Sequence, residues 1–258
     1  MSLRGNSSLA ALAVAAVSAA GATRAQSTSM MMPEGSKDLY MGVVVADVAT
    51  SEGSAARHLV AVPTASGLWS NGVFARLGAV GWDVTDDPTM DYGPLVTYGI
   101  RSKRSDDAEH ESRWDVQGGA FWNFMFTREI QFGSQLLYGG GADNQGLQLR
   151  LGADVSYRLG SHDTLTLSPG ITFADGSFMR STYGITAHQA QVDGLPAYGA
   201  KAGVRDVHLD IDWNSELATK FTLDAGVSLS RLVASAGHSP LIADRGDAQL
   251  FAALTYHF

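Results

Sequence analysis

Four ionisable side chains alternate along one short stretch of the sequence, at Asp206, His208, Asp210 and Asp212. Residues two apart in a β-strand face the same side, so these four would line one surface. Carboxylates and an imidazole on a shared inner surface can bind a cation or hold a proton. The competing interpretation is a solvated or salt-bridged polar wall. In that case the acids would face three basic residues from elsewhere in the chain: Arg150, Arg158 and Lys220.

Other candidate chemistry has weaker support in the sequence. An acidic loop comprises Asp83, Asp86, Asp87 and Asp91. Its carboxylates suit calcium, but the loop lacks the Asp-x-Asp-x-Asp-Gly spacing of a calcium site. The seven histidines form no metal-ligand pair, and the absence of cysteine excludes thiolate chemistry. His238 and Ser239 are adjacent, but no third residue completes a hydrolytic triad. The sequence therefore predicts no catalytic residue, no metal site and no cofactor.

The composition is that of a folded chain with an acidic balance. Of its 258 residues, 45% are hydrophobic and 17% are charged, which is too apolar for a disordered chain. The formal net charge is -8, and no run of Lys or Arg forms a basic patch, so nucleic acid is not an expected partner. Glycine is abundant, at 29 residues, which suits many short turns.

The first 25 residues have the order of a secretory signal peptide. Arg4 precedes an uncharged stretch, residues 9–22, and small residues follow it. This apolar stretch is shorter than the roughly 20 residues that a membrane-spanning helix needs. We expect cleavage after Ala25, with Ala22 as the alternative site. The mature protein is then exported, and residues 26–37 form a lead-in segment in the periplasm.

The remaining chain alternates between apolar and polar residues. From Leu147 to Leu159 the odd positions are apolar and the even positions are polar or glycine, which is the period of a strand with two unlike faces. We predict strands at residues 39–50, 57–65, 72–84, 90–100, 113–126, 129–138, 147–159, 164–173, 198–213, 220–230 and 247–258. The alternation changes phase at Arg205-Asp206, which predicts a β-bulge there.

The strand count decides how the chain would thread a membrane. Counting residues 178–188 as a further strand gives twelve, the even number expected of a bacterial single-chain barrel, and ten is the alternative. Long loops are expected on the outside and short turns in the periplasm. The twelve-strand count conflicts with this rule, because it places the long charged segment 101–112 in the periplasm. No amphipathic helix is predicted after the signal peptide.

Three features favour a membrane barrel over a soluble one. Many predicted strands reach the roughly 9 to 11 residues that a tilted membrane span needs. Aromatic residues lie toward strand ends on the apolar face, as in interfacial girdles: Trp82, Trp114, Tyr157, Phe173, Trp213, Tyr256 and Phe258. The last strand has one apolar face that ends in an aromatic residue, which resembles the signal that barrel-assembly machinery recognises: Leu250, Ala252, Leu254, Tyr256 and Phe258. A soluble periplasmic barrel that binds an apolar ligand remains the alternative.

About two-thirds of the chain resembles the MltA-interacting protein (MipA/OmpV) family of outer-membrane proteins. The residues that carry the resemblance lie mostly in the C-terminal third: Ser177-Phe178-Met179, Tyr183-Gly184-Ile185-Thr186, Gln189, Tyr198-Gly199-Ala200, Gly203-Val204-Arg205-Asp206-Val207, Arg231-Leu232, Ser239-Pro240-Leu241 and Leu254-Thr255-Tyr256-His257-Phe258. Residues 93–98 and 115–121 extend it into the middle of the chain.

The resemblance implies a barrel in the outer membrane of a Gram-negative bacterium. It also implies a scaffold that joins a murein-degrading lytic transglycosylase to a murein synthase, with no catalytic residues of its own. Other family members are regarded as porin-like, so a narrow solute channel is the second expectation. For a channel, the inward charged residues would be the contacts: Arg150, Asp154, Arg158, Asp206, His208, Asp210, Asp212, Lys220 and Asp224.

Overall fold

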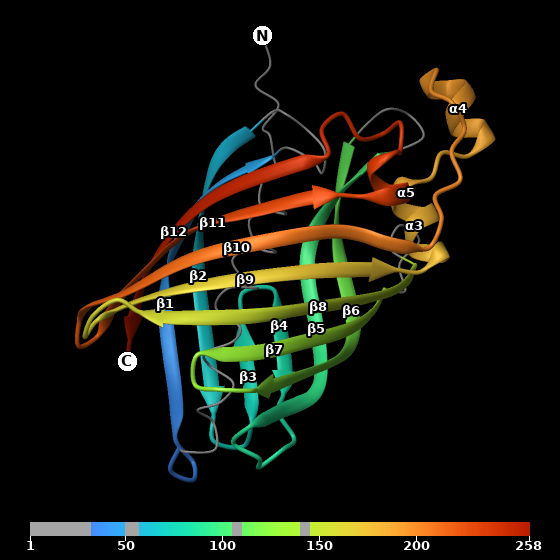
Figure 1. Cartoon of the computed structure of the whole chain (residues 1–258). Helices are drawn as coiled ribbons and strands as arrows, with labels where there is room; N and C mark the ends of the chain where they lie inside the picture. Colours follow the sequence, from blue (N-terminus) through green and yellow to red (C-terminus); the bar gives the residue numbers. More distant parts are fainter. Residues whose placement is uncertain (1–31, 50–56, 105–109, 140–144) are drawn as a thin grey trace.

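The computed structural model describes residues 32–49, 57–104, 110–139 and 145–258. In these residues, twelve antiparallel strands close into one barrel in which each strand neighbours the next along the chain (Figure 1). β1 closes the barrel by pairing with β12, with Tyr40 opposite His257. The predicted up-and-down barrel of twelve strands is confirmed.

The strands are β1 (Lys37–Ala49), β2 (Arg57–Trp69), β3 (Val73–Arg76), β4 (Ala79–Trp82), β5 (Met90–Arg104), β6 (His110–Met125), β7 (Ile130–Gly139), β8 (Gly146–Arg158), β9 (Asp163–Ala174), β10 (Gly203–Ala218), β11 (Phe221–Leu232) and β12 (Gly246–His257). The helices are α3 (Gly176–Tyr183), α4 (Ala187–Asp193) and α5 (Ala234–Gly237). None of the described helices is long and apolar enough to cross a membrane.

Two of the predicted strands are wrong. One is not a strand and the other is two strands, so the total of twelve is unchanged. The segment 178–188 is not a strand, because it lies in α3 and the start of α4. Asp175 caps α3 by accepting a hydrogen bond from the Phe178 amide at 2.7 Å, and Thr186 and Gln189 form a capping box on α4. The segment 72–84 is two short strands, β3 and β4, which pair with each other. The prediction that no helix follows the signal peptide is therefore wrong as well.

These corrections resolve the conflict over orientation. Lys37 and His257, the first and last strand residues, lie at one end of the barrel, which we call the turn end. Its connections are short: residues 70–72, 83–89, 126–129, 159–162 and 219–220. The opposite end, the loop end, carries the long connections 175–202 and 233–245. Residues 101–104 and 110–112 of the charged segment also lie at the loop end, where β5 reaches Arg104 and β6 starts at His110. The segment is therefore not on the same side as the C-terminal end of β12, where the predicted strand count had placed it.

The turn between β2 and β3 depends on a glycine. Gly72 has φ +85°, and a Cβ at this position would lie 2.2 Å from the Asp83 carbonyl oxygen. Its amide donates to the Trp69 carbonyl at 3.0 Å, and its carbonyl accepts from the Asp83 amide at 2.9 Å. Only glycine fits this backbone, so the turn fixes the position of the β3–β4 hairpin.

The outward faces of the strands are apolar. Leu59 is 74% exposed, and Leu250 and Phe258 are each more than 60% exposed. The predicted assembly residues Leu250, Ala252, Leu254, Tyr256 and Phe258 all alternate with the buried Gln249, Phe251 and Ala253, and so lie on the outer face of β12. An apolar belt of this extent would not be stable in water, and lipid is its natural environment. The exposed apolar face therefore supports the membrane barrel over the alternative drawn from the sequence, a soluble periplasmic barrel that binds an apolar ligand.

Aromatic side chains gather on the outer face at the turn end. Trp82, Tyr157 and Phe258 are each at least half exposed there. The Tyr256 ring contacts the Phe258 ring at a centroid distance of 4.9 Å. This arrangement matches the predicted girdle at one membrane boundary. The side chain of Trp114, also predicted for a girdle, lies outside the part of the chain that the structure describes.

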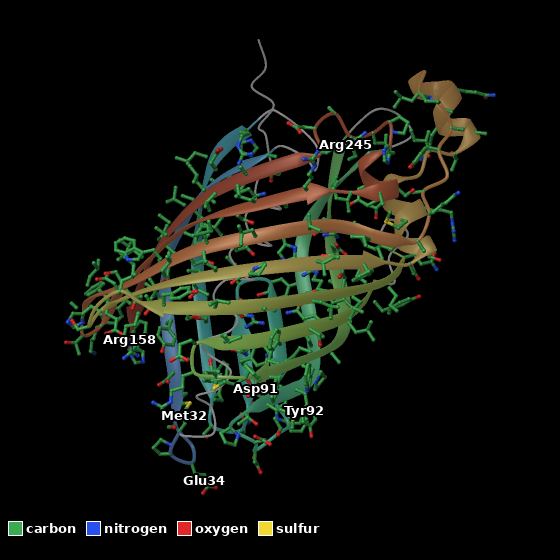
Figure 2. All side chains as sticks on the ribbon, in the orientation of Figure 1. Met32, Glu34, Asp91, Tyr92, Arg158 and Arg245 are labelled. Carbon is green, nitrogen blue, oxygen red and sulfur yellow. The ribbon has the colours of Figure 1, made fainter. Side chains whose placement is uncertain are left out.

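The lumen has one apolar wall and one polar wall. On the β2–β7 side, a buried cluster fills the interior: Leu68, Phe74, Ala79, Leu95, Phe121 and Leu137, with Met32 packed against it. Next to it, Ala46, Val48 and Phe251 form a second apolar cluster. The inward residues of β8–β11 are mostly polar or charged. Figure 2 labels one residue at each end of the barrel, Arg158 at the turn end of β8 and Arg245 at the loop end, just before β12.

The wall between β2 and β5 is incomplete toward the loop end. The β3–β4 hairpin pairs with β2 only at Gly67 and Leu68, and with β5 only at residues 95–97. Within the described residues, the rest of β2 therefore has a strand neighbour on one side alone, which is β1. Pro63 lies in this stretch, and a proline is tolerated in a strand where no backbone donor is needed.

A small folded cap covers part of the loop end. Phe178, Met179 and Tyr183 of α3 are fully buried against Leu232 of β11 and Ala236 of α5. The connections 175–202 and 233–245 are thus joined by a core of their own (Figure 1).

Candidate functional site

The predicted stripe on β10 faces the lumen. Asp206 and Asp210 are only 5% and 6% exposed. The opposite residues on β9 are small: Thr172 faces Asp206, Gly170 faces His208, Ser168 faces Asp210 and Thr166 faces Asp212. These small partners leave space above β9 for the longer side chains of β10.

The predicted bulge is present at Arg205. Val204 pairs with Phe173 and Asp206 pairs with Thr172, so Arg205 is the extra residue. The bulge brings the Arg205 guanidinium and the Asp206 carboxylate together, and they form an ion pair. Arg205 was not predicted as a site residue, although the phase change in the sequence that predicted the bulge marks its position.

The Asp206 carboxylate is fully occupied by neighbours. Besides Arg205, it accepts a hydrogen bond from Thr172 Oγ1 at 3.1 Å, and His208 Nδ1 lies 3.2 Å from its Oδ1. Arg205 also donates to Gln148 Oε1 at 2.8 Å, and Gln148 Nε2 donates to Gln117 Oε1 at 3.2 Å. This end of the stripe is a structural network that links β6, β8, β9 and β10, and it leaves no open position for a cation.

The His208 ring lies close to the backbone of the neighbouring strand at Gly170. A Cβ on Gly170 would lie 2.2 Å from His208 Nε2, so only glycine can face this ring. The ring is thereby fixed between Gly170 and Asp206.

Asp210 belongs to a different group of side chains. It lies opposite Ser228 of β11. Ser228 in turn lies opposite Gln249 of β12, which is 7% exposed. Gln249 was not named from the sequence, because a single amide in a strand has no pattern that marks it.

Ion pairs at the loop end hold Gln249 in place. Gln249 Nε2 donates to Asp247 Oδ2 at 2.7 Å, and Arg57 donates to Asp247 Oδ1 at 2.6 Å. Arg57 also bonds Asp47 at 2.8 Å. These contacts join β2, β1 and β12 at the seam where the barrel closes.

The other predicted residues are dispersed. Arg150 and Asp154 lie on the inner face of β8, each with an interaction partner, and Asp212 has one too. Asp224 accepts a hydrogen bond from Asn214 at 2.5 Å. Lys220 is not on the lumen wall: it lies in the turn between β10 and β11, with its Nζ 5.5 Å from the centre of the outward Tyr256 ring. Arg158 is exposed at the turn end.

Two carboxylates of the acidic loop accept hydrogen bonds from the loop's own backbone. Asp83 accepts from the Thr85 amide at 3.2 Å, and Asp87 accepts from the Thr89 amide at 2.8 Å. Burial raises the pKa of Asp83, whereas the hydrogen bonds from Thr89 lower the pKa of Asp87. Among the described residues, no group of three acidic or histidine side chains could hold a metal ion.

The adjacent histidine and serine do not form a catalytic pair. Ser239 Oγ donates to the Tyr183 carbonyl at 2.7 Å, and His238 Nδ1 lies 2.5 Å from the Ala234 carbonyl oxygen. Both side chains therefore bond to the backbone of the cap.

A family model described as MltA-interacting protein MipA matches residues 40–258. Several solved barrels are similar at low identity. The NanC porin is 11% identical, with 86% of this chain and 99% of that chain covered and a TM-score of 0.45. An outer membrane channel from Pseudomonas putida F1 is 12% identical, with 88% of this chain and 97% of that chain covered and a TM-score of 0.45. No curated protein matches the chain.

Proposed function

We propose that this chain, which belongs to the MltA-interacting protein (MipA) family, is an outer-membrane barrel that anchors murein-remodelling enzymes. The observation that carries the proposal is the family match over residues 40–258, because the family description names an interaction with MltA. The partners would be a lytic transglycosylase and a murein synthase, and the chain itself would supply no catalytic step. The apolar cluster in the lumen supports this proposal, since side chains packed inside a barrel suit a structural role.

The proposal includes export and assembly in a Gram-negative envelope. Residues 1–25 would be removed as a signal peptide, which N-terminal sequencing of the mature protein tests. The turn end would face the periplasm, because short turns lie on that side of bacterial barrels. The barrel-assembly machinery would recognise the outward face of β12, and lipid would surround the apolar belt.

The partner would contact the turn end, where murein enzymes have access. The longest connection there is 83–89, in which Val84 is 43% exposed and Asp86 is exposed. Beside β2, the Gly35 amide donates to Ser70 Oγ at 3.0 Å, so the turn before β1 is fixed to the barrel. Residues 26–31 lie outside the described residues and are the second proposed contact.

Co-purification tests this proposal. The tagged barrel is extracted from outer membranes and probed for a bound lytic transglycosylase. We expect Val84→Asp with Asp86→Lys to abolish capture, whereas Asp244→Lys at the loop end should leave it unchanged. Capture that survives both the Val84→Asp, Asp86→Lys variant and deletion of residues 26–31 would contradict a turn-end contact. Absence of any murein enzyme from the native complex would contradict the anchor itself.

The polar wall of β8–β11 favours a narrow channel as a second candidate function. Its buried carboxylate Asp210 would favour cations. In planar bilayers, we expect Asp210→Asn with Asp212→Asn to reduce selectivity for cations. A barrel that passes no current would exclude this function.

A further inference from the structure

Three hydrogen-bond acceptors from neighbouring strands lie in one row on the lumen wall. Asp210 on β10 pairs with Ser228 on β11, and Ser228 pairs with Gln249 on β12. Directly opposite residues have Cβ atoms about 5 Å apart, so Asp210 and Gln249 flank Ser228 on its two sides. The Ser228 hydroxyl can donate its hydrogen to one neighbour and still offer the lone pairs of its oxygen to a further group.

The orientation of the Gln249 amide is set by its neighbours. Asp247 accepts from Nε2 at 2.7 Å, and a carboxylate can accept but cannot donate, so Nε2 must face it and Oε1 must face away. Arg57 holds Asp247 from the other side at 2.6 Å. The amide therefore cannot rotate to satisfy its oxygen without losing the bond to Asp247.

Gln249 Oε1 is buried and has no hydrogen-bond partner among the described residues. The side chain is 7% exposed, so bulk water does not reach the oxygen freely. Buried acceptors are nearly always paired, and an exception calls for a donor that binds there. An acidic side chain and this open oxygen, on either side of Ser228, are suited to a donor that also carries positive charge.

We propose that Asp210, Ser228 and Gln249 bind the primary ammonium group of an amine that enters the lumen. An alkylammonium carries three N–H donors, which match the carboxylate, hydroxyl and amide oxygens one by one. Its head is about the size of a water molecule, so the site requires no larger space. The Phe251 ring follows Gln249 on the inner face of β12, and its tip lies 2.8 Å from where a Gly226 Cβ would be, so an apolar surface borders the site for the alkyl part.

The rest of the stripe explains why the site lies here. Asp206 is neutralised by Arg205 and bonded by Thr172, whereas the Asp210 group has an acceptor left over. A metal ion is a poorer match, since no described group of three acidic or histidine ligands exists. This inference does not depend on the proposed anchor function.

Calorimetric titration of the folded protein, purified from membranes, tests the proposal. The probes are n-butylammonium, which has three N–H donors, and tetramethylammonium, which has the same charge and none. We expect n-butylammonium to bind at least about tenfold more tightly, because hydrogen bonds to a charged group supply the difference. Equal affinity for both cations would overturn the proposal in favour of simple charge attraction, and no heat with either would show that water satisfies Gln249.

Variants locate the site. Asp210→Asn and Gln249→Leu should each weaken n-butylammonium binding by about tenfold or more. Asp224→Asn is the matched control, because it removes a lumen carboxylate of β11 that Asn214 already bonds, and it should leave the affinity unchanged. A gel-mobility shift on heating verifies that each variant is folded. If a variant does not fold, the comparison of the two probes on the unaltered protein still tests the proposal. Equal weakening by the control would overturn the assignment of the site.

Discussion

Removing the Arg205 guanidinium should destabilise the barrel by leaving a buried carboxylate without its cation. The Asp206 side chain is 7% exposed and that of Arg205 is 17% exposed, so water screens this pair little. Loss of one partner of a buried ion pair costs about 3 to 5 kcal/mol. Thr172 and His208 still contact Asp206 in the variant. We therefore expect Arg205→Met to lower the free energy of unfolding by about 3 kcal/mol, the lower end of that range.

Unfolding in urea, followed by tryptophan fluorescence in lipid vesicles, measures this loss. The double variant Arg205→Met with Asp206→Asn removes the charge as well as its partner. Because no uncompensated charge stays buried in it, the double variant should be more stable than Arg205→Met alone. The control Arg231→Met removes an exposed arginine of β11 and should change the stability by less than about 0.5 kcal/mol. If the double variant is no more stable than the single one, the explanation based on the buried charge is wrong.

Three further predictions concern other parts of the barrel. Gly170→Ala should destabilise it by about 2 kcal/mol, because the new Cβ would collide with the His208 ring; adding His208→Ala should restore most of the loss in the same urea assay. In the turn 83–89, Thr89 lowers the pKa of Asp87 from its ordinary value of 3.8. The stabilisation of the turn by this bond is therefore complete above pH 3.8 and is lost as the pH falls through the lowered pKa of Asp87. Proteolysis of the turn, measured across pH 2 to 6, would follow this loss. The Asp87→Asn variant should show no such pH dependence. Phe258→Ala should reduce the amount of barrel in the outer membrane while leaving the refolded protein stable, and an unchanged amount would contradict the proposed role of the C-terminal face in assembly.

The strands of the barrel were predictable because lipid imposes a simple pattern. Each span must present an apolar side to the membrane, so the alternation from Leu147 marked β8 almost to its observed bounds, Gly146–Arg158. The same alternation located the bulge at Arg205, where one extra residue reverses the faces. A local pattern was enough in both cases, because the constraint acts on each strand separately.

The errors lie where structure depends on partners distant in sequence. α3 has few apolar residues and is held by packing against Leu232 and Ala236, so its own sequence resembles a strand as much as a helix. One local signal was available, since Thr186 and Gln189 have the spacing of a capping box.

The candidate site was predictable only in part. The stripe on β10 was visible, but its division into a neutralised half and an open half depends on the register of β9, β11 and β12. Gln249 joins the site only because that register places it beside Ser228, and no pattern within a single strand reports a register.

The short hairpin β3–β4 determines where the barrel should open first. Most backbone bonds in the wall belong to strands held on both sides, but the loop-end half of β2 is held by β1 alone among the described residues. Separating this half from the wall requires one ladder to break. The same holds for the loop-end half of β5, which pairs only with β6 there, whereas a strand paired on both sides requires two ladders to break. Local opening follows the region with the fewest such bonds. Mechanical or chemical unfolding should therefore begin at these two edges, at the loop end. The ion pair of Arg57 with Asp247 is placed to resist opening at the β2 edge, because it ties β2 directly to β12.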